Sequence, residues 1–410
     1  MRGAEVAKRC IFFLGGYEPI PPVWQHERFR RELRRFESAW SARADVSELA
    51  ITPDGAVASW RIRAGGPNWS ADSEYRSLLW ADLVEADFGR PDRVRLPLGL
   101  RAFTDFIGSG TAGRYFAVNW RYGLFFAYPL FILTSFVVLA VLATRLAVDF
   151  GVVLPLLTAP LIAAAVFAGL IVFPGHFLML PYMLDDWIFA GELVHRKRPG
   201  LDERMQRFAT ELAARLRESD EDEIVFAAHS LGCALKIDVV DRALRINDAL
   251  GFRGRPLKLV STGSSILKIA LHPAAGWLRE AIGRVSRHPD VFWVEYQSMV
   301  DIISFYKVNP VTAIGLPDTG RPLIRRVHVR DMLERATYRR FKGNFFRLHR
   351  QLVMGNDKRY FYDYFMVCCG PFALETRVHR PERVVMFSPD GSLIEDNGAP
   401  SSATTEKAAR

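Results

Sequence analysis

Two long stretches without a charged residue constrain the fold of this chain more than any other feature. The first is YGLFFAYPLFILTSFVVLAVLAT, 23 residues between Arg121 and Arg145, and the second covers about 35 residues at 150–184. A helix of about 20 apolar residues is long enough to cross the hydrocarbon core of a bilayer. Two buried core helices are the alternative, but the core helices of soluble proteins rarely stay uncharged over such lengths. The sequence therefore predicts a transmembrane hairpin over 121–184.

The charges that flank these stretches predict an orientation. Arg114 and Arg121 precede the first stretch and HRKR at 195–198 follows the second, whereas the link carries Arg145 opposed by Asp149. Cytoplasmic flanks carry the excess of Lys and Arg, so both long flanks are expected in the cytoplasm. The early apolar run CIFFLGG is too short for a signal-peptide core. We expect an integral protein of the inner (cytoplasmic) membrane, with the bilayer as a partner.

Composition excludes several classes of protein. The 410 residues are 50% hydrophobic and 24% charged, which is typical of a chain with a large core rather than a disordered one. The 54 basic residues exceed the 45 acidic ones by 9, but they are spread along the chain and form no nucleic-acid-binding motif, so no nucleic-acid partner is expected. No P-loop, GxGxxG or HExxH pattern occurs, so no cofactor or metal is expected, and nothing specifies an oligomeric state. The four cysteines form no CxxC pair and suit a reducing compartment: Cys10, Cys233, Cys368 and Cys369.

Strand-like and helix-like segments alternate outside the hairpin. Such alternation predicts an α/β fold, with a mostly parallel sheet flanked by helices. The expected strands are 10–15, a hairpin at 46–63 that turns at Asp54-Gly55, 223–228, 256–265, 291–298 and 322–330, and the main expected helices are 24–40, 202–218 and 231–248. The predicted organisation is an N-terminal part of the α/β domain at 1–120, the hairpin at 121–184, a second α/β part at 185–389 and a disordered tail at 390–410.

One serine stands between a predicted strand and a predicted helix, in EIVFAAHSLGCALK at 223–236. Ser230 has small residues two positions before and after it, Ala228 and Gly232. A nucleophile held in a sharp strand-to-helix turn needs this spacing, because the strand and helix backbones approach each other closely there. The same turn directs the backbone N–H of Leu231 toward an oxyanion. The alternative is a serine that caps the helix.

The segment FAAHSLG resembles the nucleophile elbow of the α/β-hydrolase superfamily, especially its lipase- and esterase-like members, with Ala in place of the usual first Gly. The resemblance covers approximately 10–60 and 200–355. It implies that an acid and then a histidine follow the serine along the chain. Asp301, just beyond the strand at 291–298, fits the acid, with a helix cap or a surface acid as the alternative. The resemblance favours His349 over His328 as the base, because His328 falls within a predicted strand.

The resemblance also implies a second oxyanion donor after an early strand. CIFFLGGYEP supplies a strand and a glycine loop, so the N–H of Gly16 or Tyr17 is the candidate. The implied protein is a membrane-anchored serine hydrolase that cleaves an ester or thioester, with a lipid or acyl-ester substrate. The alternatives are an inactive hydrolase-like membrane scaffold or binding protein, an acyltransferase with the same triad, and a transport or structural role in the membrane.

Overall fold

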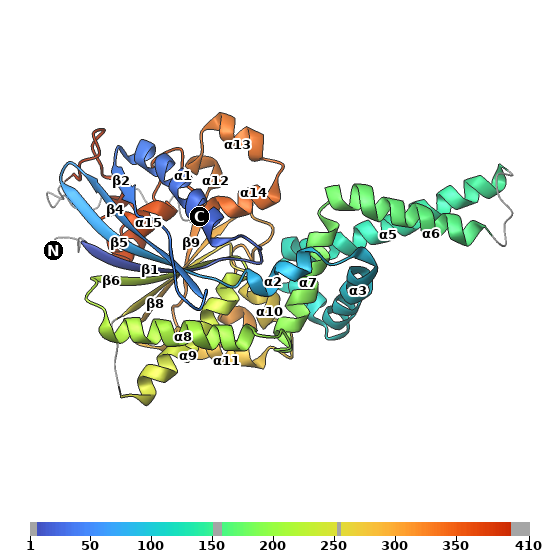
Figure 1. The fold of residues 1–410 in the computed structure, drawn as a ribbon, viewed down its shortest axis with the longest axis horizontal. Coiled ribbons are helices and arrows are strands. Elements are labelled where there is room, and N and C mark those ends of the chain that lie inside the picture. Colours follow the sequence, from blue (N-terminus) through green and yellow to red (C-terminus); the bar gives the residue numbers. More distant parts are fainter. Residues whose placement is uncertain (1–5, 151–157, 252–255, 395–410) are drawn as a thin grey trace. The chain divides into compact units, whose positions relative to one another are not determined.

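The computed structural model describes residues 6–150, 158–251 and 256–394. The chain forms two compact units (Figure 1). Unit 2, Val84–Arg198 with Leu271–Ala274, extends beyond the predicted hairpin on both sides, so residues on either side of 121–184 fold together with it. Unit 1 comprises the remaining segments: Met1–Leu83, Pro199–Ala270 and Ala275–Arg410.

Unit 1 is built on a mixed sheet of nine strands, in the order β2-β4-β5-β1-β6-β7-β8-β9, with β3 paired to β4. The strands from β5 to β9 along this order are parallel, whereas β4 runs antiparallel to β5 and to β2. The α/β class is confirmed, and the sheet is mixed rather than wholly parallel. The strands are β1 Lys8–Leu14, β2 Arg43–Val46, β3 Ala50–Ile51, β4 Val57–Gly66, β5 Trp69–Leu78, β6 Glu223–His229, β7 Leu257–Thr262, β8 Val291–Ser298 and β9 Leu323–Val327.

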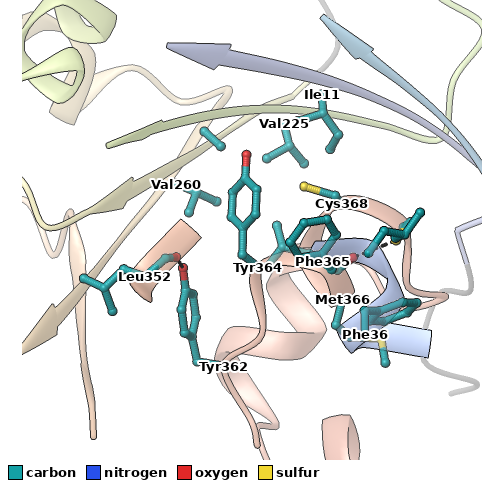
Figure 2. Close-up of a cluster of buried hydrophobic side chains, with 14 of the residues drawn as sticks. Ile11, Phe36, Val225, Val260, Leu352, Tyr362, Tyr364, Phe365, Met366 and Cys368 are labelled. Carbon is teal, nitrogen blue, oxygen red and sulfur yellow. Dashed lines mark hydrogen bonds between the residues drawn. The ribbon is translucent and has the colours of Figure 1, made fainter. Parts of the chain in front are cut away.

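Helices cover both faces of the sheet (Figure 1). α1 (Pro22–Trp40) and α15 (Tyr364–Cys369) lie on one face, and α8 (Leu201–Glu218), α9 (Gly232–Ala249) and α11 (Gly276–Arg287) lie on the other. Figure 2 shows the core on the first face, where Val225 and Val260 of the sheet point toward Tyr364. The shorter helical segments of unit 1 are α10 Ile266–Ala270, Thr312–Ile314, α12 Val329–Met332, α13 Arg335–Phe341, α14 Phe345–Arg350, Gln351–Val353, α16 Leu374–His379 and Arg383–Val385.

The burial of each strand explains which strands could be predicted. Every residue of β6 is buried, as expected for a parallel strand covered by helices on both faces. An apolar run such as EIVFAA is therefore easy to recognise. β5 was not predicted, because the buried residues of WSADSEYRSL include Ala71, Ser73 and Ser77, which are small or polar. The predicted hairpin turn is confirmed at Asp54-Gly55, where Gly55 has a φ of +67°.

Unit 2 is helical, and one of its helices is long and apolar enough to cross a membrane. This helix, α5, covers all of the first charge-free stretch. The second stretch is not one straight helix over the described residues from 158 onward, because Ala159–Gly175 and α7 are bent by 91° relative to each other, so a second span there remains a prediction. Pro174 and Met179, with a φ of +61°, lie at the break. The helical elements are α2 Asp82–Phe88, which begins in unit 1, α3 Asp92–Gly108, α4 Thr111–Val118, α5 Trp120–Asp149, α6 Ala159–Leu170, a π-helical turn Ile171–Gly175 and α7 Leu180–Val194.

The C-terminal segment is ordered further than the sequence predicted. Phe387 and Leu393 form a bridge, and Trp69 Nε1 donates a hydrogen bond of 3.0 Å to the carbonyl oxygen of Gly391. The prediction of disorder is therefore wrong for 390–394, while 395–410 lies outside the described residues.

Candidate active site

Ser230 occupies the sharp turn between β6 and α9 in a strained backbone conformation. Its φ is +56°, in the left-handed region that costs a non-glycine residue about 1–2 kcal/mol. Three backbone hydrogen bonds hold it there. Its N–H donates to the carbonyl oxygen of Thr262 at 3.1 Å, and its own carbonyl oxygen accepts from the N–H groups of Cys233 and Ser265 at 3.1 and 3.2 Å. Strain maintained in this way is characteristic of functional residues.

The small residues around the turn are required by close backbone approach. A Cβ atom on Gly232 would lie 2.4 Å from the carbonyl oxygens of both Leu14 and Gly15, and one on Gly16 would lie 2.9 Å from Ser230 Cβ. Helix α9 begins at Gly232 with Leu231 at the N-cap position, and no side chain caps it. The turn therefore has the geometry of a nucleophile elbow, and Ser230 does not act as a capping serine.

A histidine and an aspartate form a buried pair in the same unit. His349 Nδ1 lies 2.8 Å from Asp301 Oδ2, and these residues are 5% and 1% exposed. Asp301 follows β8, and its Oδ1 accepts the N–H of Ile303 at 3.1 Å. His349 lies in α14, beyond β9. A carboxylate acceptor at Nδ1 places the proton there and leaves the Nε2 lone pair free to accept a proton. In the part of the chain that the structure describes, His349 Nε2 is buried and has no hydrogen-bond partner.

Gly263, at the end of β7, packs directly against this pair. It follows Thr262, whose carbonyl oxygen holds the N–H of Ser230. The φ of Gly263 is +53°. A Cβ atom added to it would lie 2.7 Å from His349 Cε1 and 3.0 Å from Asp301 Oδ2. Only a residue without a side chain fits between β7 and the imidazole.

Two other histidines, His229 and His328, have different surroundings. His229, beside the serine, stacks at 4.4 Å between ring centroids on His349, and its Nε2 lies 3.1 Å from the carbonyl oxygen of His349. Burial, with a further contribution from His349, holds the pKa of His229 well below its usual value, so the ring stays neutral and donates this bond. His328 has an exposed side chain at the start of α12, 3.6 Å from Asp331. It is His349 that meets Asp301.

Two backbone N–H groups are available for an oxyanion. Gly16, in the loop after β1, packs against Ser230, and Leu231 directly follows it. Within the described residues neither the Gly16 nor the Leu231 N–H makes a hydrogen bond. The indole of Trp80 donates to the carbonyl oxygen of Gly15 at 3.2 Å and so fixes the loop. Tyr17, the other candidate for the second donor, has a buried side chain in the same loop.

Two ionisable groups are buried in the helix and strands next to the elbow. Lys236 of α9 donates from Nζ to the carbonyl oxygen of Val260 at 2.9 Å and to Ser261 Oγ at 2.7 Å. Burial lowers its pKa to about 8. Burial likewise raises the pKa of Glu295, in β8, to about 7, although Gln297 donates a 2.8 Å hydrogen bond to it. Glu295 lies inside the strand, as predicted, and does not contact His349 through any hydrogen bond among the described residues.

Among the described residues, two clusters of His, Cys and carboxylate side chains have ligand atoms close enough together to hold a metal ion. In unit 2, His195 and His272 each direct Nε2 to Asp105 Oδ2, at 2.8 and 3.6 Å. However, His272 Nδ1 accepts the N–H of Ala274, which leaves the hydrogen of the neutral ring on Nε2, the atom that a metal would need.

The second cluster, in unit 1, already holds a cation. It comprises Cys10, Glu74 and Glu221, and Arg215 donates to both carboxylates. Burial raises the pKa of Cys10 to about 12, so the thiolate that a metal would bind is disfavoured. Neither donor set favours a metal over the ion pairs that it already makes.

Sequence reasoning missed three residues next to the site. Gly263 falls within the expected strand 256–265, whereas the strand ends at Thr262 and Gly263 directly follows it. Arg28 falls within the expected helix 24–40, where it is one of several arginines. Trp80 had no signal, because β5, which precedes it, was not predicted.

Comparisons of this chain with protein-family models, curated proteins and solved structures return no match. Its function must therefore be inferred from the geometry of the site.

Proposed function

We propose that this protein is a membrane-anchored serine hydrolase that cleaves carboxylic esters or thioesters with Ser230, His349 and Asp301. The observation that carries the proposal is the strained Ser230 turn beside the buried His349–Asp301 pair, whose imidazole contacts the ring of His229, the residue before Ser230. A helix cap or a surface acid would require neither feature.

In the proposed reaction, His349 Nε2 takes the proton from Ser230 Oγ as Oγ attacks the carbonyl carbon of the substrate. The N–H groups of Leu231 and Gly16 stabilise the negative charge that develops on the carbonyl oxygen. His349 then protonates the leaving alcohol or thiol, which departs and leaves an acyl-serine. Water attacks the acyl-serine with His349 again as the base, and the acid product and free Ser230 are released. Asp301 orients the imidazole and stabilises its cationic form.

The positions of the three residues in the sheet also support the proposal. Ser230 follows β6, Asp301 follows β8 and His349 follows β9, so all three lie beyond the carboxyl ends of parallel strands. This edge is the usual place for a site in an α/β sheet. The order serine, acid, histidine is also the one implied by the resemblance to α/β-hydrolases.

The exposed side chains of unit 2 support a membrane anchor. α5 displays a row of exposed apolar residues, and Phe173 and Phe177 at the bent segment are 85% and 87% exposed. α5 and α6 pack side by side (Figure 1). We infer that α5 crosses the bilayer and that the bent pair is either a broken second span or a re-entrant segment. An enzyme held there is concentrated where lipid and acyl-ester substrates reside, so we propose such an ester as its substrate. The large exposed apolar residues of α5, and Phe150 directly after it, are Trp120, Leu124, Tyr128, Phe131, Val137, Val138, Leu139, Val141, Leu142, Leu146 and Phe150.

The test uses the full chain in detergent with a fluorophosphonate probe and p-nitrophenyl butyrate. We expect one probe per chain by intact mass and measurable ester hydrolysis, and both should be lost in Ser230→Ala. Ser219→Ala is the matched control, because Ser219 lies at the end of α8 and its hydroxyl bonds to Glu221. An unlabelled wild type, with hydrolysis equal to that of Ser230→Ala, would favour an inactive scaffold instead.

A further inference from the structure

A small cleft in unit 1 is lined by Gly15 and Gly16, the loop that packs against the candidate nucleophile. Gly16 of the oxyanion loop lines it, and a Cβ atom on Gly16 would lie 3.4 Å from Ser230 Oγ. We call this space the Gly16 cleft. A substrate whose carbonyl oxygen is bound by the Gly16 N–H must therefore place its neighbouring atoms in or beside this cleft.

The walls of the Gly16 cleft differ in polarity. Phe13, Ile20, Leu78 and Trp80 supply apolar surface. Arg28 of α1 supplies a guanidinium group, and its side chain is 25% exposed. A cleft of this kind fits a short apolar segment that ends in a charged group.

The charges at the cleft do not cancel. Arg28 Nη1 lies 3.9 Å from Glu18 Oε2, which is too long for a hydrogen bond. The other oxygen of Glu18 accepts a 2.7 Å hydrogen bond from Arg350 Nε. Two guanidinium groups therefore share one carboxylate, and one positive charge is left over. Within the described residues, Arg28 makes no hydrogen bond.

The positive field reaches His229, the residue before the candidate nucleophile. Arg350 directly follows His349 in α14. His229 directly precedes Ser230. Burial and His349 are the main causes that lower the pKa of His229, and the charges of Arg350 and Arg28 lower it further. A guanidinium group presents paired N–H donors that match carboxylate and phosphate oxygens.

We propose that the Gly16 cleft binds an anionic carboxylate or phosphate group of the ester substrate, and that Arg28 recognises this group. The inference rests on the proposed hydrolase function and narrows its substrate to acyl esters that carry a negative charge near the scissile bond. The anion would replace part of the contact that Glu18 makes with Arg28.

The experiment compares three chromogenic butyrate-sized esters on the full chain in detergent. p-Nitrophenyl butyrate is neutral, mono-p-nitrophenyl succinate carries a carboxylate on the acyl side, and 4-butyryloxy-3-nitrobenzoate carries one on the alcohol side. We expect wild type to prefer one anionic ester, and the preferred ester identifies the side of the scissile bond that enters the cleft.

Three variants test the role of Arg28. We expect Arg28→Gln to lower kcat/KM for the preferred anionic ester about 10- to 100-fold and to change the neutral ester less than about threefold, because a charge-assisted bond is lost. Glu18→Gln should raise the preference, because it removes the competing carboxylate. Arg30→Gln is the matched control, since Arg30 lies on the exposed side of the same helix and should leave the preference unchanged.

The outcomes separate this inference from the proposed function. Hydrolysis of all three esters with an anionic-to-neutral ratio that Arg28→Gln does not change would overturn the inference alone. No hydrolysis of any ester, together with no fluorophosphonate labelling of Ser230, would overturn the proposed function and this inference with it.

Discussion

The substitution Gly263→Ala tests whether the contact between β7 and the His349–Asp301 pair matters for catalysis. The added Cβ atom would lie 2.7 Å from His349 Cε1, whereas an ordinary contact begins at 3.4 Å, so the imidazole must move by about 0.7 Å. A displacement of about 1 Å in a catalytic group costs roughly 100-fold in rate. We therefore expect kcat to fall by about that factor.

The same substitution carries a separate cost in stability. Alanine at a φ of +53° is disfavoured by about 1–2 kcal/mol, which should lower Tm by a few degrees. Gly315→Ala is the matched control, because Gly315 has a φ of +80° but open space where its Cβ atom would lie. It should lose similar stability and keep its activity.

The assay is the rate of p-nitrophenyl butyrate hydrolysis, supported by the rate of fluorophosphonate labelling and a thermal melt of each variant. Equal activity in Gly263→Ala and Gly315→Ala would mean that the position of the imidazole has no role in the reaction. A large loss of activity in both variants would also contradict the prediction for Gly263→Ala, because the loss would then follow from backbone strain alone.

Three further predictions concern the acid, a buried carboxyl group and the membrane helix. Asp301→Asn should lower kcat for ester hydrolysis about 10⁴-fold, while circular dichroism should show that the fold is retained. A loss of kcat under tenfold would remove Asp301 from the proposed mechanism. Because burial raises the pKa of Glu295 from 4.5 to about 7, its protonated form stabilises the fold fully below pH 4.5, and this stabilisation is lost as pH rises through 7. The free energy of unfolding, measured by denaturant titration, should fall across that window by up to about 1.4 kcal/mol per pH unit, and Glu295→Gln should reduce this fall. The same pH dependence in Glu295→Gln and wild type would contradict this prediction. Val138→Arg places a charge near the middle of α5, where a charged residue raises the free energy of membrane insertion by about 2.5–3.5 kcal/mol. Less of this variant than of Val138→Leu should stay in the membrane during alkaline carbonate extraction. Full extraction of wild type would argue against the anchor.

The sequence was informative where burial and chemistry both leave a pattern. β6 is apolar throughout because helices cover both of its faces, and the small residues around Ser230 follow from backbone contacts that tolerate no larger side chain. The α/β class and the strand-turn-helix around Ser230 could therefore be predicted. The assignment of Ser230, Asp301 and His349 to a catalytic triad remains a prediction, now supported by the 2.8 Å contact between the last two.

Other features depend on contacts between distant segments and left no local pattern. β5 lies between β4 and β1 with small polar residues on its buried side, so its sequence reads as a loop. The 91° bend before α7 occurs inside an apolar segment, and hydropathy alone does not distinguish a bent pair from one straight helix. Arg28 resembles its solvent-exposed neighbours in α1 until the fold places it at the Gly16 cleft.

The central claim is that His349 activates Ser230, and peptide mass spectrometry after fluorophosphonate treatment tests it most directly. We expect the adduct to map to Ser230, His349→Gln to slow labelling at least 100-fold, and His328→Gln to label at the wild-type rate. An adduct on another residue, or a labelling rate that His349→Gln leaves unchanged, would contradict it.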